Sequence, residues 1–187
     1  MDIITISLKS GLYAVRFDGK EKNEYSQFLS SVTDLDYVID YLTKYATMLD
    51  HPFWRRHGFS SSEDSIFACA HCIVEEAFEM VGMIKDMVAG ERNEYPFSFT
   101  ELFQPLDGPY KNVWELIPSK AYGPCYPSFL RLYAIALKDG GYVIVDGGIK
   151  LANSIQNDPD LSTHVFKKID STKRFLIDND IYLQDDI

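Results

Sequence analysis

A short run of cysteine and histidine residues is the first feature of this chain that could support chemistry. Cys69, His71 and Cys72 lie within four positions, and Cys125 could complete the tetrahedral ligand set that Zn²⁺ prefers. On a helix, however, His71 points away from both cysteines, and no second Cys/His pair lies nearby in the sequence. Three cysteines are also an odd and sparse set for a disulfide framework. We therefore favour small, buried, reduced thiols, and we predict no metal and no cofactor.

A group of cations beside predicted strands is the second such feature. Residues 130–137 alternate large apolar side chains with Arg131, tyrosine and alanine, and residues 142–145 are rich in valine and isoleucine. An Asp-Gly-Gly turn joins the two segments, which is typical of an antiparallel hairpin because glycine adopts positive φ without steric cost. Arg131 is therefore expected on a strand, and Lys150 just after the hairpin.

Hydrophobic periodicity predicts the elements that must position these residues. We expect three further strands, at residues 3–8, 12–17 and 113–117. We also expect three helices, at about residues 34–50, 62–89 and 160–178. Residues 118–128 contain three prolines and are expected to form a loop. The first two strands form a hairpin that cannot stand alone in water, so it must join the sheet or pack beside it. The predicted fold class is α+β, an antiparallel sheet with packed helices and an N-terminal β-hairpin.

Helix caps follow from short polar signals. Thr33 is expected to cap the first helix, and Ser60 with Glu63 has the spacing of a capping box before the second. Gly90 is a suitable stop for the second helix, and Asp160 is the expected cap of the third.

Two descriptions of the domain organisation are open at this stage. Residues 1–107, with the hairpin and two helices, and residues 108–187, with the sheet and last helix, form either two segments or one compact domain. A chain of 187 residues, 46% of them hydrophobic, has room for a sizeable core in either case.

The charge distribution bears on the class of partner. The chain carries a formal net charge of -10, with 9 basic and 18 acidic side chains in residues 1–110 and 9 and 10 in residues 111–187. An acidic N-terminal part is a poor surface for RNA or the ribosome, because nucleic-acid affinity depends on neutralising phosphates. No apolar run reaches the ~18–20 residues of a membrane span, and the start lacks a basic segment before an apolar one, so we expect no membrane contact and a cytoplasmic location.

The second predicted helix also suggests a surface for a partner. Glu75, Glu76 and Glu79 are expected on the face opposite its apolar stripe. Such a run is usually a solvated face, and the alternative is that it binds a basic protein.

The segment around Trp54 combines aromatic and basic side chains. Trp54 with its neighbouring arginines could stack on a nucleobase or anchor the loop to the protein. We favour anchoring, because burial is the commoner use of a tryptophan.

The C-terminal segment, about residues 102–180, resembles the RelE/ParE superfamily, in particular its HigB-like, phage-derived branch. The resemblance lies in the order of VWELIPSKAY, FLRLYAIALKDGGYVIVDGGIK and a last helix containing FKK and TKR. In that branch, strands of the form W-E-L-R and Y-R-V precede a hydrophobic strand that ends in a G-F-x-K-K turn. The resemblance implies a RelE-like fold preceded by an N-terminal extension.

The same resemblance implies a metal-independent endoribonuclease of a toxin-antitoxin system, with an antitoxin or another protein as partner. Such enzymes cut messenger RNA with the RNA's own 2′-hydroxyl as nucleophile, so they need a proton acceptor and cations around the phosphate. Arg131 matches the strand arginine of the family and Lys150 the first lysine of the turn. Lys120 and Tyr122 would add a phosphate contact and an aromatic face.

Two departures from the family pattern leave an alternative open. Ile117 and Leu151 stand where the family has an arginine and a second lysine, so each departure removes a cation. Arg131 and Lys150 would then be solvated charges at a sheet edge. The chain would be a non-catalytic interaction module of a phage or mobile element that uses its acidic helical face.

Overall fold

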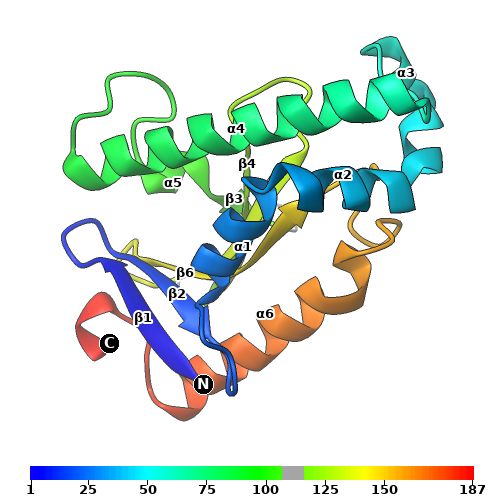
Figure 1. Cartoon of the computed structure of the whole chain (residues 1–187). Coiled ribbons are helices and arrows are strands. Elements are labelled where there is room, and N and C mark those ends of the chain that lie inside the picture. Colours follow the sequence, from blue (N-terminus) through cyan, green and yellow to red (C-terminus); the bar gives the residue numbers. More distant parts are fainter. Residues whose placement is uncertain (107–115) are drawn as a thin grey trace.

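The structure is a computed structural model that describes residues 1–106 and 116–187. It has the predicted α+β fold, with one six-stranded sheet between helices on its two faces (Figure 1). The strands are β1 (Asp2–Ser7), β2 (Leu12–Arg16), β3 (Gln104–Pro105), β4 (Ile117–Tyr122), β5 (Leu130–Ala136) and β6 (Tyr142–Ile149). The helices are α1 (Glu24–Val32), α2 (Leu35–Lys44), α3 (Pro52–Arg56), α4 (Glu63–Ala89), α5 (Phe99–Leu102) and α6 (Leu161–Asp178), with 3₁₀ turns η1 (Ala46–Asp50) and η2 (Gln184–Asp186).

The sheet is mixed, whereas the sequence predicted an antiparallel one. Its order is β1-β2-β6-β5-β4-β3, and the pairs are antiparallel except β2 with β6, which run parallel. The N-terminal hairpin therefore joins the sheet through β2. Strands from both sides of the predicted boundary near residue 107 share this one sheet.

Alternation along β5 divides the core between the two faces of the sheet. Leu130, Leu132 and Ala134 belong to a buried cluster with residues of α1, α2 and α4, whereas Tyr133 and Ile135 belong to a cluster with residues of α6. Successive side chains of a strand point to opposite faces, so β5 is buried on both. Figure 1 shows α1, α2 and α4 on one side of the sheet and α6 on the other.

The first predicted helix divides into α2 and the following 3₁₀ turn η1. Its cap is Asp34, whose carboxylate accepts hydrogen bonds from the backbone of Asp36 and Tyr37, and not Thr33, which ends the preceding α1. Helix α1 has no counterpart among the helices predicted from the sequence. The Asn23 side chain caps this helix by accepting from the Ser26 backbone N–H at 2.8 Å.

The second and third predicted helices are confirmed as α4 and α6. Gly90 ends α4 at φ 75°, a left-handed conformation that suits glycine, but its N-cap is Ser62 and the predicted capping box is absent from this terminus. Neither α4 nor any other helix of the described residues combines the length and apolarity needed to cross a membrane.

Residues 118–122 do not form the predicted loop. They belong to β4, which pairs with β5 from Ile117 opposite Ala136 to Tyr122 opposite Arg131. Of the strand expected at residues 113–117, the first three positions lie outside the described residues, and Ile117 begins β4. Lys120 and Tyr122 are consequently strand residues with a defined direction.

Candidate functional site

Four side chains that the sequence analysis selected line one pocket. Cross-strand pairing sets Tyr122 opposite Arg131 and Lys120 opposite Tyr133, so these side chains point to the face of the sheet that carries α6. Lys150 follows β6, and its backbone N–H bonds to the Phe129 carbonyl at 2.7 Å. A pocket of about 200 Å³, here called the cationic pocket, is lined among others by Lys120, Tyr122, Arg131, Tyr133, Lys150 and Asn153.

Arg131 is held from two directions. Its guanidinium carbon lies 3.9 Å from the centre of the Tyr122 ring, and Nη1 donates to Ser128 Oγ at 2.9 Å and to the Leu130 carbonyl at 2.6 Å. Lys120 Nζ lies 5.7 Å from the centre of the same ring. These contacts fix the guanidinium plane beside the pocket, which favours binding of an oxyanion.

Lys150 has an unusual acid-base environment. Burial lowers its pKa to about 8, and the positive charge of Arg131 acts in the same direction, against the opposing effect of Asp158. Its ammonium group donates to the Asn153 carbonyl at 2.9 Å. Because this pKa lies near neutrality, Lys150 can both accept and donate a proton in the pH range of most enzymes.

Tyr133 is a site residue that the sequence analysis missed. Its side chain is fully buried, its hydroxyl has no hydrogen-bond partner among the described residues, and it lines the cationic pocket. A buried hydroxyl normally has a partner. Its position two residues after Arg131 on the same strand was the available signal, since i and i+2 share a face.

A second pocket of about 410 Å³, here called the aromatic pocket, adjoins the first. The two share Tyr122, Arg131, Lys150 and Asn153. Its other walls come from α3 and from the loop between β4 and β5, and they include Phe53, Trp54, Tyr126 and Pro127.

Trp54 anchors the wall of the aromatic pocket. It is 3% exposed, stacks on Phe129 with ring centres 4.1 Å apart, and donates from Nε1 to the Leu151 carbonyl at 2.7 Å. The favoured interpretation of this aromatic segment, that it anchors its own loop, is therefore confirmed for Trp54. Tyr126 is different, because it is 84% exposed.

The predicted acidic face of α4 is only partly exposed. Glu75 and Glu79 face solvent, but Glu76 is 1% exposed, so its placement on a solvated face was wrong. Glu76 Oε2 accepts from the Phe129 backbone N–H at 3.0 Å, and burial raises the pKa of its carboxyl. Its role is to hold the β4–β5 loop, which forms a wall of the aromatic pocket. Periodicity could not reveal this, because the loop that covers Glu76 lies about 50 positions further along the chain.

A larger groove lies beside Glu79. It has a volume of about 660 Å³, and its walls include the carboxylates of Glu79, Asp86, Glu94 and Glu101 together with Arg92. Arg92 and Asp86 are 3.9 Å apart, so one cation faces four anions. This surface, here called the acidic groove, suits a positively charged ligand.

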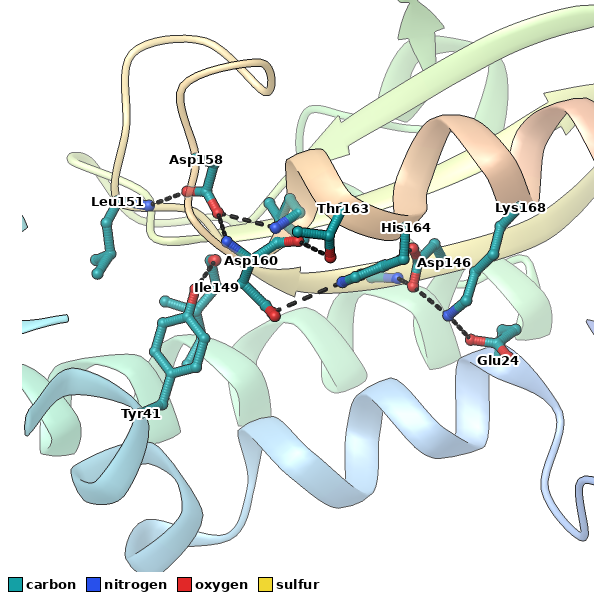
Figure 2. A network of polar contacts seen from close by, with 12 residues as sticks. Glu24, Tyr41, Asp146, Ile149, Leu151, Asp158, Asp160, Thr163, His164 and Lys168 are labelled. Atoms are coloured by element: carbon teal, nitrogen blue, oxygen red, sulfur yellow. Dashed lines mark hydrogen bonds and ion pairs between the residues drawn. The ribbon is translucent and has the colours of Figure 1, made fainter. Parts of the chain in front are cut away.

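A buried polar network lies apart from these pockets, on β6, α1 and α6. Figure 2 shows Asp146 between His164 and Lys168, with Glu24 beyond the lysine. Asp146 contacts His164 Nδ1 at 2.6 Å and Lys168 Nζ at 2.9 Å, and Lys168 contacts Glu24 at 2.6 Å. The hydrogen bond to Asp146, together with one to Asp160, raises the pKa of His164 to about 9. Each charge is paired, so the network joins the three elements.

Asp158 organises the start of α6. Its buried carboxylate accepts from the backbone N–H groups of Leu151, Ala152, Asp160 and Leu161 at 2.9–3.3 Å (Figure 2). Asp160, the predicted cap, occupies the N-cap position, but its side chain makes no capping bond. Asp158 thereby fixes the chain just after Lys150 to the helix.

The cysteine and histidine run is dispersed around α4. Cys69 is buried, whereas His71 and Cys72 are exposed, so the expectation of buried thiols is correct for Cys69 and wrong for Cys72. Within residues 1–106 and 116–187, no three His, Cys, Asp or Glu side chains form a group that could hold a metal ion.

Comparison with protein-family models, with curated proteins and with solved structures gave no significant match.

Proposed function

We propose that this chain is a RelE/HigB-like, metal-independent endoribonuclease of the toxin type, which cleaves single RNA strands at the cationic pocket. The observation that supports the proposal is the convergence of Lys120, Tyr122, Arg131 and Lys150 on one open pocket. Solvated edge charges repel one another and have no reason to converge in a hollow, whereas a bound phosphate would stabilise them.

The side chains of the pocket can supply each group that the reaction needs. Lys150, in its neutral form, takes the proton of the ribose 2′-hydroxyl, whose oxygen attacks the adjacent phosphorus. Arg131 donates to the non-bridging phosphate oxygens, whose charge increases in the transition state. The bond to the 5′ oxygen breaks, and Lys120 donates the proton that this oxygen needs. The products are a 2′,3′-cyclic phosphate and a 5′-hydroxyl end.

The net charge of -10 is only a weak objection to this proposal. The affinity of a site depends on the field at the site, and three cations around a partly desolvated pocket act at short range. The carboxylates of the acidic groove line a different hollow, and Tyr122 is the residue that the linings of the two hollows have in common.

Cleavage of a single-stranded RNA by the purified full-length chain tests the proposal, with chelator present throughout. We expect 2′,3′-cyclic phosphate ends, and a loss of about a hundredfold or more in rate for Lys150→Ala and for Arg131→Ala. Lys167→Ala, which removes an exposed cation from α6, is the matched control and should cleave normally. Folded variants that cleave like the wild type would contradict the proposal.

A second candidate function is the binding of a basic protein partner, such as an antitoxin, at the acidic groove. The observation that favours it is the set of four carboxylates around a groove of about 660 Å³. Titration with a lysine-rich peptide should then show binding that weakens with salt and is lost in the double variant Glu79→Lys, Glu94→Lys. Unchanged binding in that variant would exclude the groove.

A further inference from the structure

We infer that the aromatic pocket is a subsite for one unpaired nucleobase, and that the ligand of the whole site is a single-stranded RNA whose adjoining phosphate lies in the cationic pocket. This inference rests on the proposed function and goes beyond it, since it names the part of the substrate that the protein recognises and the residues that recognise it.

Continuity of the two pockets is the first argument. Tyr122, Arg131, Lys150 and Asn153 line both, so a ligand held in one reaches the other without leaving the protein surface. Two of the three cations, Arg131 and Lys150, lie at this shared boundary, and the larger, more aromatic hollow lies beyond it. A nucleotide has the same division, with a charged phosphate joined through its sugar to a flat base.

The aromatic rings at the mouth of the larger pocket are the second argument. Tyr126 is 84% exposed, and Tyr122 is 45% exposed. Tyr126 contacts His57 edge-on, with ring centres 5.5 Å apart and an angle of 86°. Exposed rings together with cations, here Arg131 and Lys150, are the combination that single-strand binding proteins use, because every base has a face that can stack on a ring.

The rigidity of the walls is the third argument. The Trp54 side chain is fixed by stacking on Phe129 and by its hydrogen bond to the Leu151 carbonyl. Glu76 accepts a hydrogen bond from the backbone of the β4–β5 loop, which forms another wall. Arg131 donates a hydrogen bond from Nη1 to Ser128 Oγ of the same loop. A preformed hollow loses little conformational entropy when a base enters it.

The position of the subsite selects against double-stranded RNA. A base can enter a hollow beside its own phosphate only if it turns out of its stack, and this costs least in an unpaired strand. The ligand is therefore an RNA that is single-stranded at this point and carries an intact base next to the bound phosphate.

Binding of non-cleavable RNA to the full-length chain tests the inference apart from catalysis. The probes are a short 2′-O-methyl oligonucleotide, the same strand in a duplex, the same strand with abasic positions, and ribose 5-phosphate. We expect the intact single strand to bind at least about tenfold more tightly than the abasic strand or the duplex. Tyr126→Ala should weaken binding of the intact strand about tenfold and leave ribose 5-phosphate unchanged.

Phe78→Ala is the matched control, because Phe78 is an exposed aromatic residue of α4 outside both pockets. Equal binding of intact and abasic strands, or a Tyr126→Ala variant that binds like the wild type, would overturn the inference. The two proposals fail separately. Discrimination for the base without cleavage of unmodified RNA would refute the nuclease alone, and cleavage without that discrimination would refute the subsite alone.

Discussion

The ring of Tyr122 covers the guanidinium of Arg131, with 3.9 Å between the guanidinium carbon and the ring centre. The two residues face each other across β4 and β5, and both line the cationic and the aromatic pocket. This pair therefore stands where the two pockets, the proposed phosphate and base subsites, meet. The Tyr122 ring thus both orients the Arg131 guanidinium and forms part of the wall of each pocket.

Removing this ring should impair the site more than the fold. Tyr122→Ala should lower RNA binding and cleavage about tenfold, because the guanidinium loses the surface that orients it, while the free energy of unfolding falls by only about 1 kcal/mol. Tyr122→Phe keeps the ring and should behave like the wild type. Chemical denaturation and cleavage assays on the three proteins provide the comparison.

Cleavage should depend on pH through Lys150. Its pKa is lowered to about 8, and only the neutral amine can accept a proton, so the rate should rise with pH and level off above about 8. Lys150→Arg keeps the positive charge but stays protonated, so it should be slow at all pH values and show no such rise. A wild-type rate that is flat from pH 6 to pH 9 would contradict the role of Lys150 as the base.

Salt should weaken RNA binding only moderately. Three cations line the pocket, so the logarithm of the binding constant should fall with the logarithm of salt concentration at a slope of about -2. Lys120→Ala should make the slope shallower by about 0.7, since it removes one phosphate contact. A much steeper slope would mean that a basic surface outside this pocket carries the binding.

His164 should make folding stability depend on pH on the alkaline side. Its pKa is raised from 6.5 to about 9 in the folded chain, so its contribution is complete below about pH 6.5 and is lost as pH rises through about 9. With about a third of the side chain exposed, we expect a difference on the order of 2 kcal/mol between wild type and His164→Gln at pH 6, shrinking towards pH 10. His71→Gln, on the exposed side of α4, is the control.

Asp158 should be among the most sensitive positions of the fold. Its buried carboxylate accepts four backbone N–H groups, so Asp158→Ala should cost about 3 kcal/mol or more, while Asp158→Asn should cost less because it retains an acceptor. Asp170→Ala removes an exposed carboxylate from α6 and should change stability by less than about 0.5 kcal/mol. Equal midpoints of thermal unfolding for the two alanine variants would contradict this role.

Local patterns in the sequence determined much of the fold. The apolar stripes of α4 and α6, the Asp-Gly-Gly turn between β5 and β6, and the N-terminal hairpin were predictable because each depends on residues within a few positions of one another. The choice of Lys120, Tyr122, Arg131 and Lys150 as candidate site residues came from the resemblance to the RelE/HigB branch, and not from these local patterns. Local patterns did not predict α1, whose signal is a single Asn cap before nine residues. The three prolines in residues 118–128 predicted a loop, although Pro118 lies in β4.

Only the tertiary structure decided the strand pairing and the burial of individual side chains, because both depend on contacts between residues that are far apart in the chain. The register of β4 on β5 sets Lys120 opposite Tyr133, so that the buried Tyr133 helps to line the cationic pocket. The parallel pairing of β2 with β6 makes the sheet mixed. The β4–β5 loop covers Glu76, which its helix alone would leave in water. The segment that packs over a charged side chain thus decides whether that side chain is solvated, is buried and holds a neighbouring loop, or forms part of a site. Helical or strand periodicity carries no information about that packing.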